Sequence, residues 1–130
     1  MPKKSLIICP VAEPLTFDDR YNREEHWRYT NPDRSYETLI IAYSDFEPEP
    51  GTYDTLIKQK GFKWSMAKDI LNRMDYSDYE YIGFADADLI TDIENVDRAI
   101  FTAYYNSISA FQMSVTPDSD IFWPILVQNS

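Results

Sequence analysis

Residues 38–43, TLIIAY, are apolar at almost every position. A strand with one face in water alternates apolar and polar side chains, whereas a strand covered on both faces does not need to. Short, continuously apolar strands occur mainly in parallel sheets with helices on each side. The run therefore predicts a buried strand in an α/β domain.

Three further short apolar runs fit the same sheet, at residues 5–9, 79–85 and 108–115. Helical or loop segments separate the four runs, an order that is typical of α/β domains with a mostly parallel sheet. The length of 130 residues suits one domain with one core. We therefore expect a single α/β domain over residues 1–130.

The spacing of apolar residues predicts two helices that cross over the sheet. Phe62, Met66, Ile70 and Met74 follow one another at intervals of four, so they would share one helix face. Further along, Thr91 and Glu94 have the spacing of a capping box. Apolar residues continue after this box at helical periodicity, namely Ile93, Val96, Ile100, Phe101 and Tyr104.

Charge and composition exclude several classes of function. The net charge of -10 would repel a phosphate backbone over most of the surface, so nucleic acid is not an expected partner. The single cysteine, Cys9, cannot form an internal disulfide, and no stretch has the roughly 20 apolar residues of a transmembrane helix. These features favour a cytoplasmic protein. Residues 121–127, IFWPILV, need a covering surface, either on this domain or in a homo-oligomer.

Asp86 and Asp88 come directly after the apolar run 79–85. Ligands of parallel α/β sheets bind beyond the carboxyl ends of the strands, where these carboxylates are expected. Alternation along an extended chain would place both on one side, facing one cation. Mg²⁺ and Mn²⁺ prefer carboxylate oxygens and keep coordination positions for substrate phosphates. The pattern predicts a metal site for an anionic substrate, and the alternative is a solvated turn.

Basic and acidic residues near the other strand ends add a second signal. Lys60 and Lys63 flank Gly61 at the start of the first predicted helix, where a phosphate or nucleotide would be attracted. Asp45 follows the strand at 38–43, a position from which a carboxylate can bind a ribose or a base. Ordinary turn chemistry is the alternative for Asp45, and a solvated helix flank is the alternative for each lysine.

Several other catalytic classes lack their motifs in this sequence. With three glycines the chain has neither a G-x-G-x-x-G dinucleotide loop nor a P-loop. One histidine and one cysteine exclude the usual zinc clusters. His26 is interpreted as a packed or surface residue and not as a catalytic base. No catalytic residue is assigned from the sequence.

The segments SLIICPVAE, TLIIAYSDF, GFKWSMAKDIL and YEYIGFADADLI together resemble the nucleotide-binding half of GT-A fold glycosyltransferases. The resemblance implies a Rossmann-like, three-layer α/β sandwich that binds a nucleotide sugar, most simply a UDP-sugar, with Mn²⁺ or Mg²⁺. It also implies hexosyl transfer to an acceptor that the sequence does not identify. GT-A enzymes usually carry a further half with an acceptor site and a third metal ligand, so the resemblance covers the donor-binding half.

The resemblance also assigns roles to individual residues. It implies that Asp88 binds the metal directly and that Asp86 binds the ribose or a metal-bound water. The remaining nucleotide contacts that it implies are Pro10, Val11 and Ala12 around the base, Asp45 at the base or ribose, and Lys63 near the nucleotide.

Two other readings of this sequence remain open. Phosphatases of the haloacid dehalogenase type also use D-x-D, with the first carboxylate as nucleophile, but their motif ends the opening strand and continues with Thr or Val. Here the motif occurs late, and Ile90 stands at that position. The third reading is a non-catalytic domain that keeps the fold for nucleotide binding or assembly.

Overall fold

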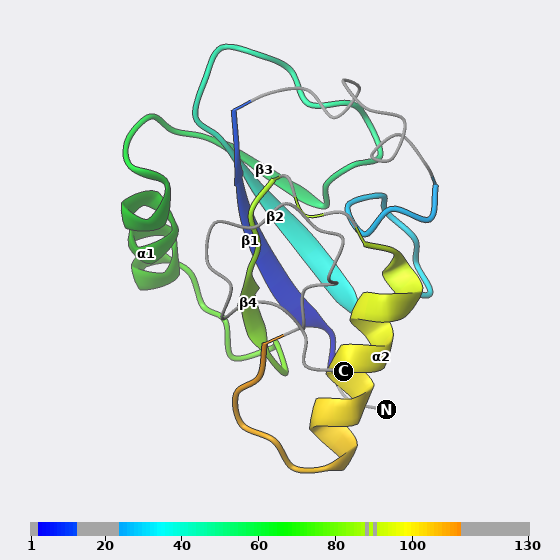
Figure 1. Cartoon of the computed structure of the whole chain (residues 1–130). Coiled ribbons are helices and arrows are strands. Elements are labelled where there is room, and N and C mark those ends of the chain that lie inside the picture. The colour runs from blue at the N-terminus through cyan, green and yellow to red at the C-terminus, as the bar shows by residue number, and fades with distance from the viewer. Residues whose placement is uncertain (1–2, 13–23, 88, 90, 113–130) are drawn as a thin grey trace, which may run out of the picture.

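Two of the apolar runs of the sequence form neighbouring strands inside a parallel sheet (Figure 1). In this computed structural model, which describes residues 3–12, 24–87, 89 and 91–112, strand β1 spans Ser5–Val11 and strand β2 spans Tyr36–Ala42. They pair in parallel along their whole lengths, from Ser5 with Tyr36 to Val11 with Ala42. Both strands are buried at nearly every position, as the continuous apolar pattern predicts.

Two shorter strands complete the described sheet. Strand β3 (Thr55–Lys58) pairs in parallel with β2, and strand β4 (Ile82–Phe84) pairs in parallel with β1. The order is β3-β2-β1-β4, so all four strands are parallel and their carboxyl ends share one edge of the sheet. The expected α/β class with a mostly parallel sheet is therefore confirmed.

Helices cover opposite faces of this sheet (Figure 1). Helix α1 (Lys63–Arg73) packs through Met66, Ala67 and Ile70 on one face. Helix α2 (Ile93–Tyr105) packs through Val96 and Ile100 on the other. Side chains of β1 alternate between these two cores, because successive residues of a strand point to opposite faces.

The helix boundaries differ from the predicted ones in two respects. Phe62 keeps the four-residue spacing but precedes α1, and its side chain is 86% exposed, so it does not share the buried face. At α2 the residue before the first turn is Asp92, and its side chain makes no capping hydrogen bond. The capping box predicted from Thr91 and Glu94 is therefore wrong, although the apolar periodicity of the helix is confirmed.

The strand predictions need three corrections. The run at 79–85 forms strand only at Ile82–Phe84, and in the described sheet this strand lies at the edge, not at the centre. Residues 108–112 follow α2 without forming a strand, and residues 113–115 lie outside the described part. Strand β3, with only four half-exposed residues, was not predicted, since so short a run has little apolar signal.

A network of polar groups attaches residues 24–35 to strand β2. The Arg34 guanidinium is 1% exposed and forms an ion pair with Asp54, while it also donates to the carbonyls of Trp27 and Tyr29. The same Asp54 carboxylate accepts a hydrogen bond from the backbone N–H of Thr38 at 2.7 Å. This network fixes the segment against β2. No helix in the described part of the chain is long and apolar enough to cross a membrane.

Candidate functional site

The chain leaves β4 beside the end of β1. Phe84 pairs with Ile8, and the backbone N–H of Ala85 then donates to the Ile8 carbonyl at 3.0 Å. This register brings Asp86 to the carboxyl edge next to the last residues of β1. The predicted position of Asp86 beyond the end of a strand is therefore confirmed, whereas Asp88 lies outside the described residues.

Backbone and side-chain hydrogen bonds attach the loop after β4 to residues 24–30. Trp27 donates through its indole N–H to the Leu89 carbonyl at 2.9 Å and through its backbone N–H to the Thr91 carbonyl at 3.1 Å. The backbone N–H of Ile93 donates to the Glu25 carbonyl at 2.8 Å. Trp27 itself is fully buried against the core under α2. The loop that carries Asp86 is thus held from both ends.

The metal site predicted from Asp86 and Asp88 has one described member. Asp86 is exposed at the carboxyl edge, so its carboxylate is accessible to a cation. Within the described part of the chain, no three His, Cys, Asp or Glu side chains converge in a way that could hold a metal ion. A site here would therefore combine Asp86 with Asp88, substrate phosphates and water, an arrangement that Mg²⁺ commonly accepts. Mn²⁺ or Mg²⁺ stays a prediction.

The three residues expected around a base lie at the end of β1. Pro10 and Val11 are buried inside the sheet, and Val11 accepts a hydrogen bond at its carbonyl from the backbone N–H of Tyr43 at 3.1 Å. Ala12 follows the strand and is half-buried, and its carbonyl accepts a hydrogen bond from the Ser44 hydroxyl. Of the three, Ala12 offers the most accessible surface.

Asp45 and Lys60 are brought together at the ends of β2 and β3. Both side chains line a surface pocket of about 470 Å³, and the Lys60 ammonium lies 3.8 Å from the Asp45 carboxylate. The Lys60 side chain is 78% exposed and the Asp45 side chain is 93% exposed, so their pairing contributes little to stability. A second ion pair, between Lys58 and Glu47, lines the same pocket. The charges of this pocket are therefore balanced, and a phosphate would compete with Asp45 for Lys60.

The pocket and Asp86 lie on one edge but not at one point. Because β1 and β2 separate β3 from β4, Lys60 and Asp86 are at least about three strand spacings apart, or roughly 14 Å or more. A ligand that contacts both would lie extended along the carboxyl edge. Lys63 begins α1 at the same edge, and its side chain lies outside what the structure describes.

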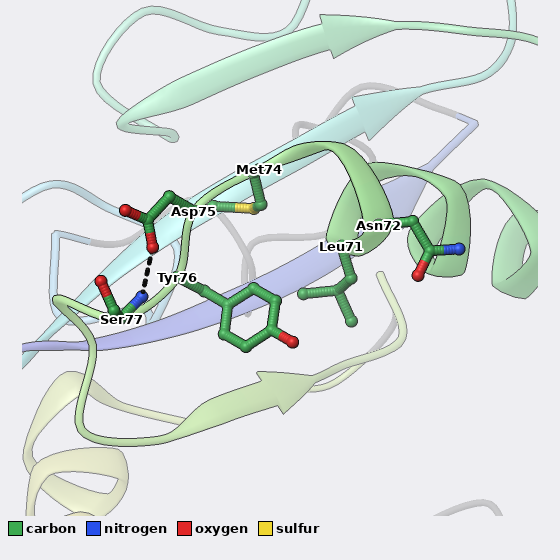
Figure 2. A pocket seen from close by; sticks show the side chains of 6 residues that line it. All are labelled: Leu71, Asn72, Met74, Asp75, Tyr76 and Ser77. Atoms are coloured by element: carbon green, nitrogen blue, oxygen red, sulfur yellow. Dashed lines mark hydrogen bonds between the residues drawn. The ribbon is translucent and has the colours of Figure 1, made fainter.

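A second pocket, of about 400 Å³, lies at the far end of α1 (Figure 2). It is lined by residues at the end of the helix and in the following turn: Leu71, Asn72, Met74, Asp75, Tyr76 and Ser77. The Asp75 carboxylate accepts a hydrogen bond from the Ser77 backbone N–H at 3.0 Å, which lowers the pKa of Asp75. This hydrogen bond closes a turn and occupies the Asp75 carboxylate, and the side chains that line the pocket include no cation. We assign no chemistry to it.

Sequence reasoning missed Arg28, the most unusual charged residue of the described structure. Its side chain is 1% exposed, and burial lowers the pKa of its guanidinium. Residues 14–32 are polar and aromatic with weak periodicity, so no pattern indicated that a charge would be buried there. The only signal is local, in the aromatic cluster HWRY around it.

Taken together, the carboxyl edge presents one exposed carboxylate after β4, a charge-balanced pocket after β2 and β3, and the first turns of both helices. Ligands of parallel α/β sheets bind at such an edge. Comparisons with known protein families, curated proteins and solved structures found no match to this chain.

Proposed function

We propose that this domain binds a nucleotide sugar together with Mn²⁺ or Mg²⁺ at the carboxyl edge of the sheet, and that it serves glycosyl transfer to an acceptor. The observation that carries the proposal is the strand order β3-β2-β1-β4. In this order the direction of strand addition reverses between β1 and β4, and ligands of open α/β sheets bind in the crevice at such a reversal. Asp86 follows β4 at this point.

The chemistry of the edge supports a metal-bridged diphosphate. A chain with a net charge of -10 repels a diphosphate, and the exposed carboxylate of Asp86 repels it further. A divalent cation bound to Asp86 and Asp88 would reverse this effect and would also stabilise the diphosphate as a leaving group. An acceptor hydroxyl would then attack the anomeric carbon. We assign the base for this step to none of the described residues.

The rest of the edge supports an extended donor. Ala12 lies on the β1 side of the reversal, while Asp45 and Lys60 lie farther along the same edge after β2 and β3. We propose that the base and ribose lie toward Ala12 and Asp45. The finer assignment to a Rossmann-like, GT-A type sandwich is part of this proposal. So is a cytoplasmic location, which rests on Cys9 being the single cysteine of the sequence, so that no internal disulfide can form.

The test is a calorimetric titration of the full chain with UDP and UDP-sugars, with and without Mn²⁺. We expect the metal to increase the affinity for UDP strongly, and Asp88→Asn to abolish this gain without unfolding the protein. Asp86→Asn should weaken binding less if it contacts the ribose or a metal-bound water. Asp75→Asn is the matched control, because its amide oxygen can still accept from Ser77 and it lies away from this edge.

Three outcomes would contradict the proposal in whole or in part. Equal affinity for UDP with and without metal, in a folded sample, would mean that the carboxylates only solvate a turn. A phosphorylated intermediate that depends on Asp86 would instead indicate a phosphatase. Metal-dependent binding of UDP-sugars without turnover, even with a panel of acceptor sugars, would favour the non-catalytic nucleotide-binding domain.

A further inference from the structure

The Arg28 guanidinium lacks partners on one of its edges. Its Nε and Nη2 atoms are both buried, and neither has a hydrogen-bond partner among the described residues. Nearly all buried polar groups in folded proteins are hydrogen-bonded, and an unpaired buried charge is especially costly. A guanidinium in this position therefore indicates a partner that the described residues do not supply.

The identity of the two unpaired atoms defines the shape of that partner. Nε and Nη2 lie on the same edge of the planar guanidinium, and their N–H groups point in nearly parallel directions. Such an edge binds two oxygens of one oxyanion at once, as in bidentate pairs of arginine with phosphate or carboxylate. Arg34 shows the contrasting case in this chain, because it has Asp54 and two carbonyls as partners.

The surroundings of Arg28 place it next to the proposed site. Trp27, its neighbour in the chain, donates two hydrogen bonds to the loop after β4, at Leu89 and Thr91. The groups that act electrostatically on Arg28 are the Cys9 thiol in the second half of β1, the Glu49 carboxylate and the Tyr29 phenol. Arg28 therefore belongs to the segment that holds the loop carrying Asp86, and Cys9 of β1 lies within electrostatic range of it.

We propose that Arg28 binds a phosphate group of the nucleotide donor through its Nε and Nη2 edge, an assignment that rests on the function proposed above. The buried cation would complement the metal, since one would hold the phosphate from within the domain and the other from the exposed edge. Because Arg28 is 1% exposed, the residues that cover its guanidinium have to move to admit the ligand.

The first test measures stability without any ligand. Arg28→Met keeps an unbranched side chain out to the position of Nε and removes the buried guanidinium, whose Nε and Nη2 atoms lack partners, so the melting temperature should rise by about 3 °C or more. Arg98→Met is the control, since Arg98 is exposed on α2 and pairs only with Glu94 at 3.0 Å. A fall in melting temperature for Arg28→Met would show that a carboxylate of this chain pairs with Arg28, and would overturn the proposal.

The second test measures phosphate binding with inorganic pyrophosphate and with UDP, in low salt. Both ligands should bind to the wild-type protein and raise its melting temperature. Arg28→Met should lower the affinity for each ligand by about tenfold or more. Arg28→Lys should give an intermediate loss of affinity, because lysine keeps the positive charge but lacks the two parallel N–H groups of the guanidinium edge. Wild-type binding should also change the hydrogen exchange of the backbone amides in residues 24–30.

These outcomes separate the two proposals. Metal-dependent binding of UDP that Arg28→Met leaves unchanged would overturn the role of Arg28 and leave the proposed function intact. Binding of pyrophosphate that depends on Arg28 but not on metal would support the phosphate site and contradict the metal-dependent donor site. Binding of pyrophosphate but not UDP would assign Arg28 to free phosphate and overturn its assignment to a nucleotide.

Discussion

The indole N–H of Trp27 donates a hydrogen bond to the carbonyl of Leu89 over 2.9 Å, and 62 positions of the sequence separate the two residues. Leu89 is part of the loop that carries Asp86, whereas Trp27 is fully buried in the core under α2. A core residue therefore fixes the position of the loop, so a substitution of this core residue should alter the carboxyl edge of the sheet.

Trp27→Phe tests this connection. The change removes the hydrogen bond to Leu89 and part of the buried ring, so the free energy of unfolding should fall by about 2 kcal/mol. Metal-dependent binding of UDP should weaken as well, because the loop loses an anchor. Urea unfolding and calorimetry measure the two effects. Unchanged metal-dependent affinity in the folded variant would show that this bond does not position the loop.

Asp54→Ala tests the ion pair that fixes residues 24–35. The change leaves the buried Arg34 without its carboxylate and also removes an acceptor for the backbone N–H of Thr38, so we expect a loss of about 3 kcal/mol in unfolding free energy. Asp69→Ala is the control, because Asp69 pairs with Arg73 on the exposed face of α1. The unfolding free energy of Asp69→Ala should fall by less than about 1 kcal/mol. Similar losses in both variants would contradict the role given to Asp54.

Tyr36 should make the protein sensitive to alkali. Burial raises the pKa of its phenol, and its hydroxyl donates to the Trp27 carbonyl at 2.6 Å. In the unfolded chain the phenol ionises near pH 10, about its ordinary pKa, while in the folded chain it keeps its proton. The unfolded state thus binds fewer protons above this pH, and the free energy of unfolding should fall as the pH rises.

Tyr36→Phe isolates this contribution. The variant should lose about 1 kcal/mol at pH 8 with the hydrogen bond, but its stability should decline less steeply between pH 9 and 11. Denaturant unfolding across this pH range measures both quantities. Tyr105→Phe, at an exposed residue of α2, serves as the control. An alkaline decline equal to that of the wild type would show that Tyr36 does not cause it.

Gly61 should not tolerate a side chain. It connects Lys60 to α1 with a φ of +147°, which favours glycine, and an added Cβ would lie 3.3 Å from the Cγ of the buried Met66. Gly61→Ala should lower the unfolding free energy by about 1–2 kcal/mol. Gly83→Ala is the comparison, since its Cβ would meet Ile7 at an ordinary 3.6 Å and its φ is not positive. A smaller loss at Gly61 than at Gly83 would contradict this account.

The sequence predicted those parts of the fold whose physical signal is strong. Continuous apolar runs identified β1 and β2, because both faces of these strands are covered. Periodicity identified both helices but not where they begin, since Phe62 fits the spacing although it is exposed. Strand β3 escaped prediction because four half-exposed residues at a sheet edge carry no distinctive pattern.

The candidate site was predictable where it depends on strand ends. Asp45 and Asp86 lie at the carboxyl edge because each follows a parallel strand, and this order is readable from the sequence. The meeting of Asp45 with Lys60 was not readable, because it requires β3 to pair with β2. Arg28 could not be predicted either, since its burial results from contacts between segments far apart in the chain.

The pairing of β1 also affects how the chain folds during its synthesis. β1 is made before β4, yet the backbone N–H of Tyr81, at the entrance to β4, bonds to the Ser5 hydroxyl across 76 positions of the sequence. At about 5–20 residues per second, a ribosome needs roughly 4 to 15 s to make the intervening chain. During that time one edge of the most apolar strand stays unpaired. A nascent chain of this protein therefore exposes the backbone N–H and C=O groups along one side of an apolar strand until β4 has been made.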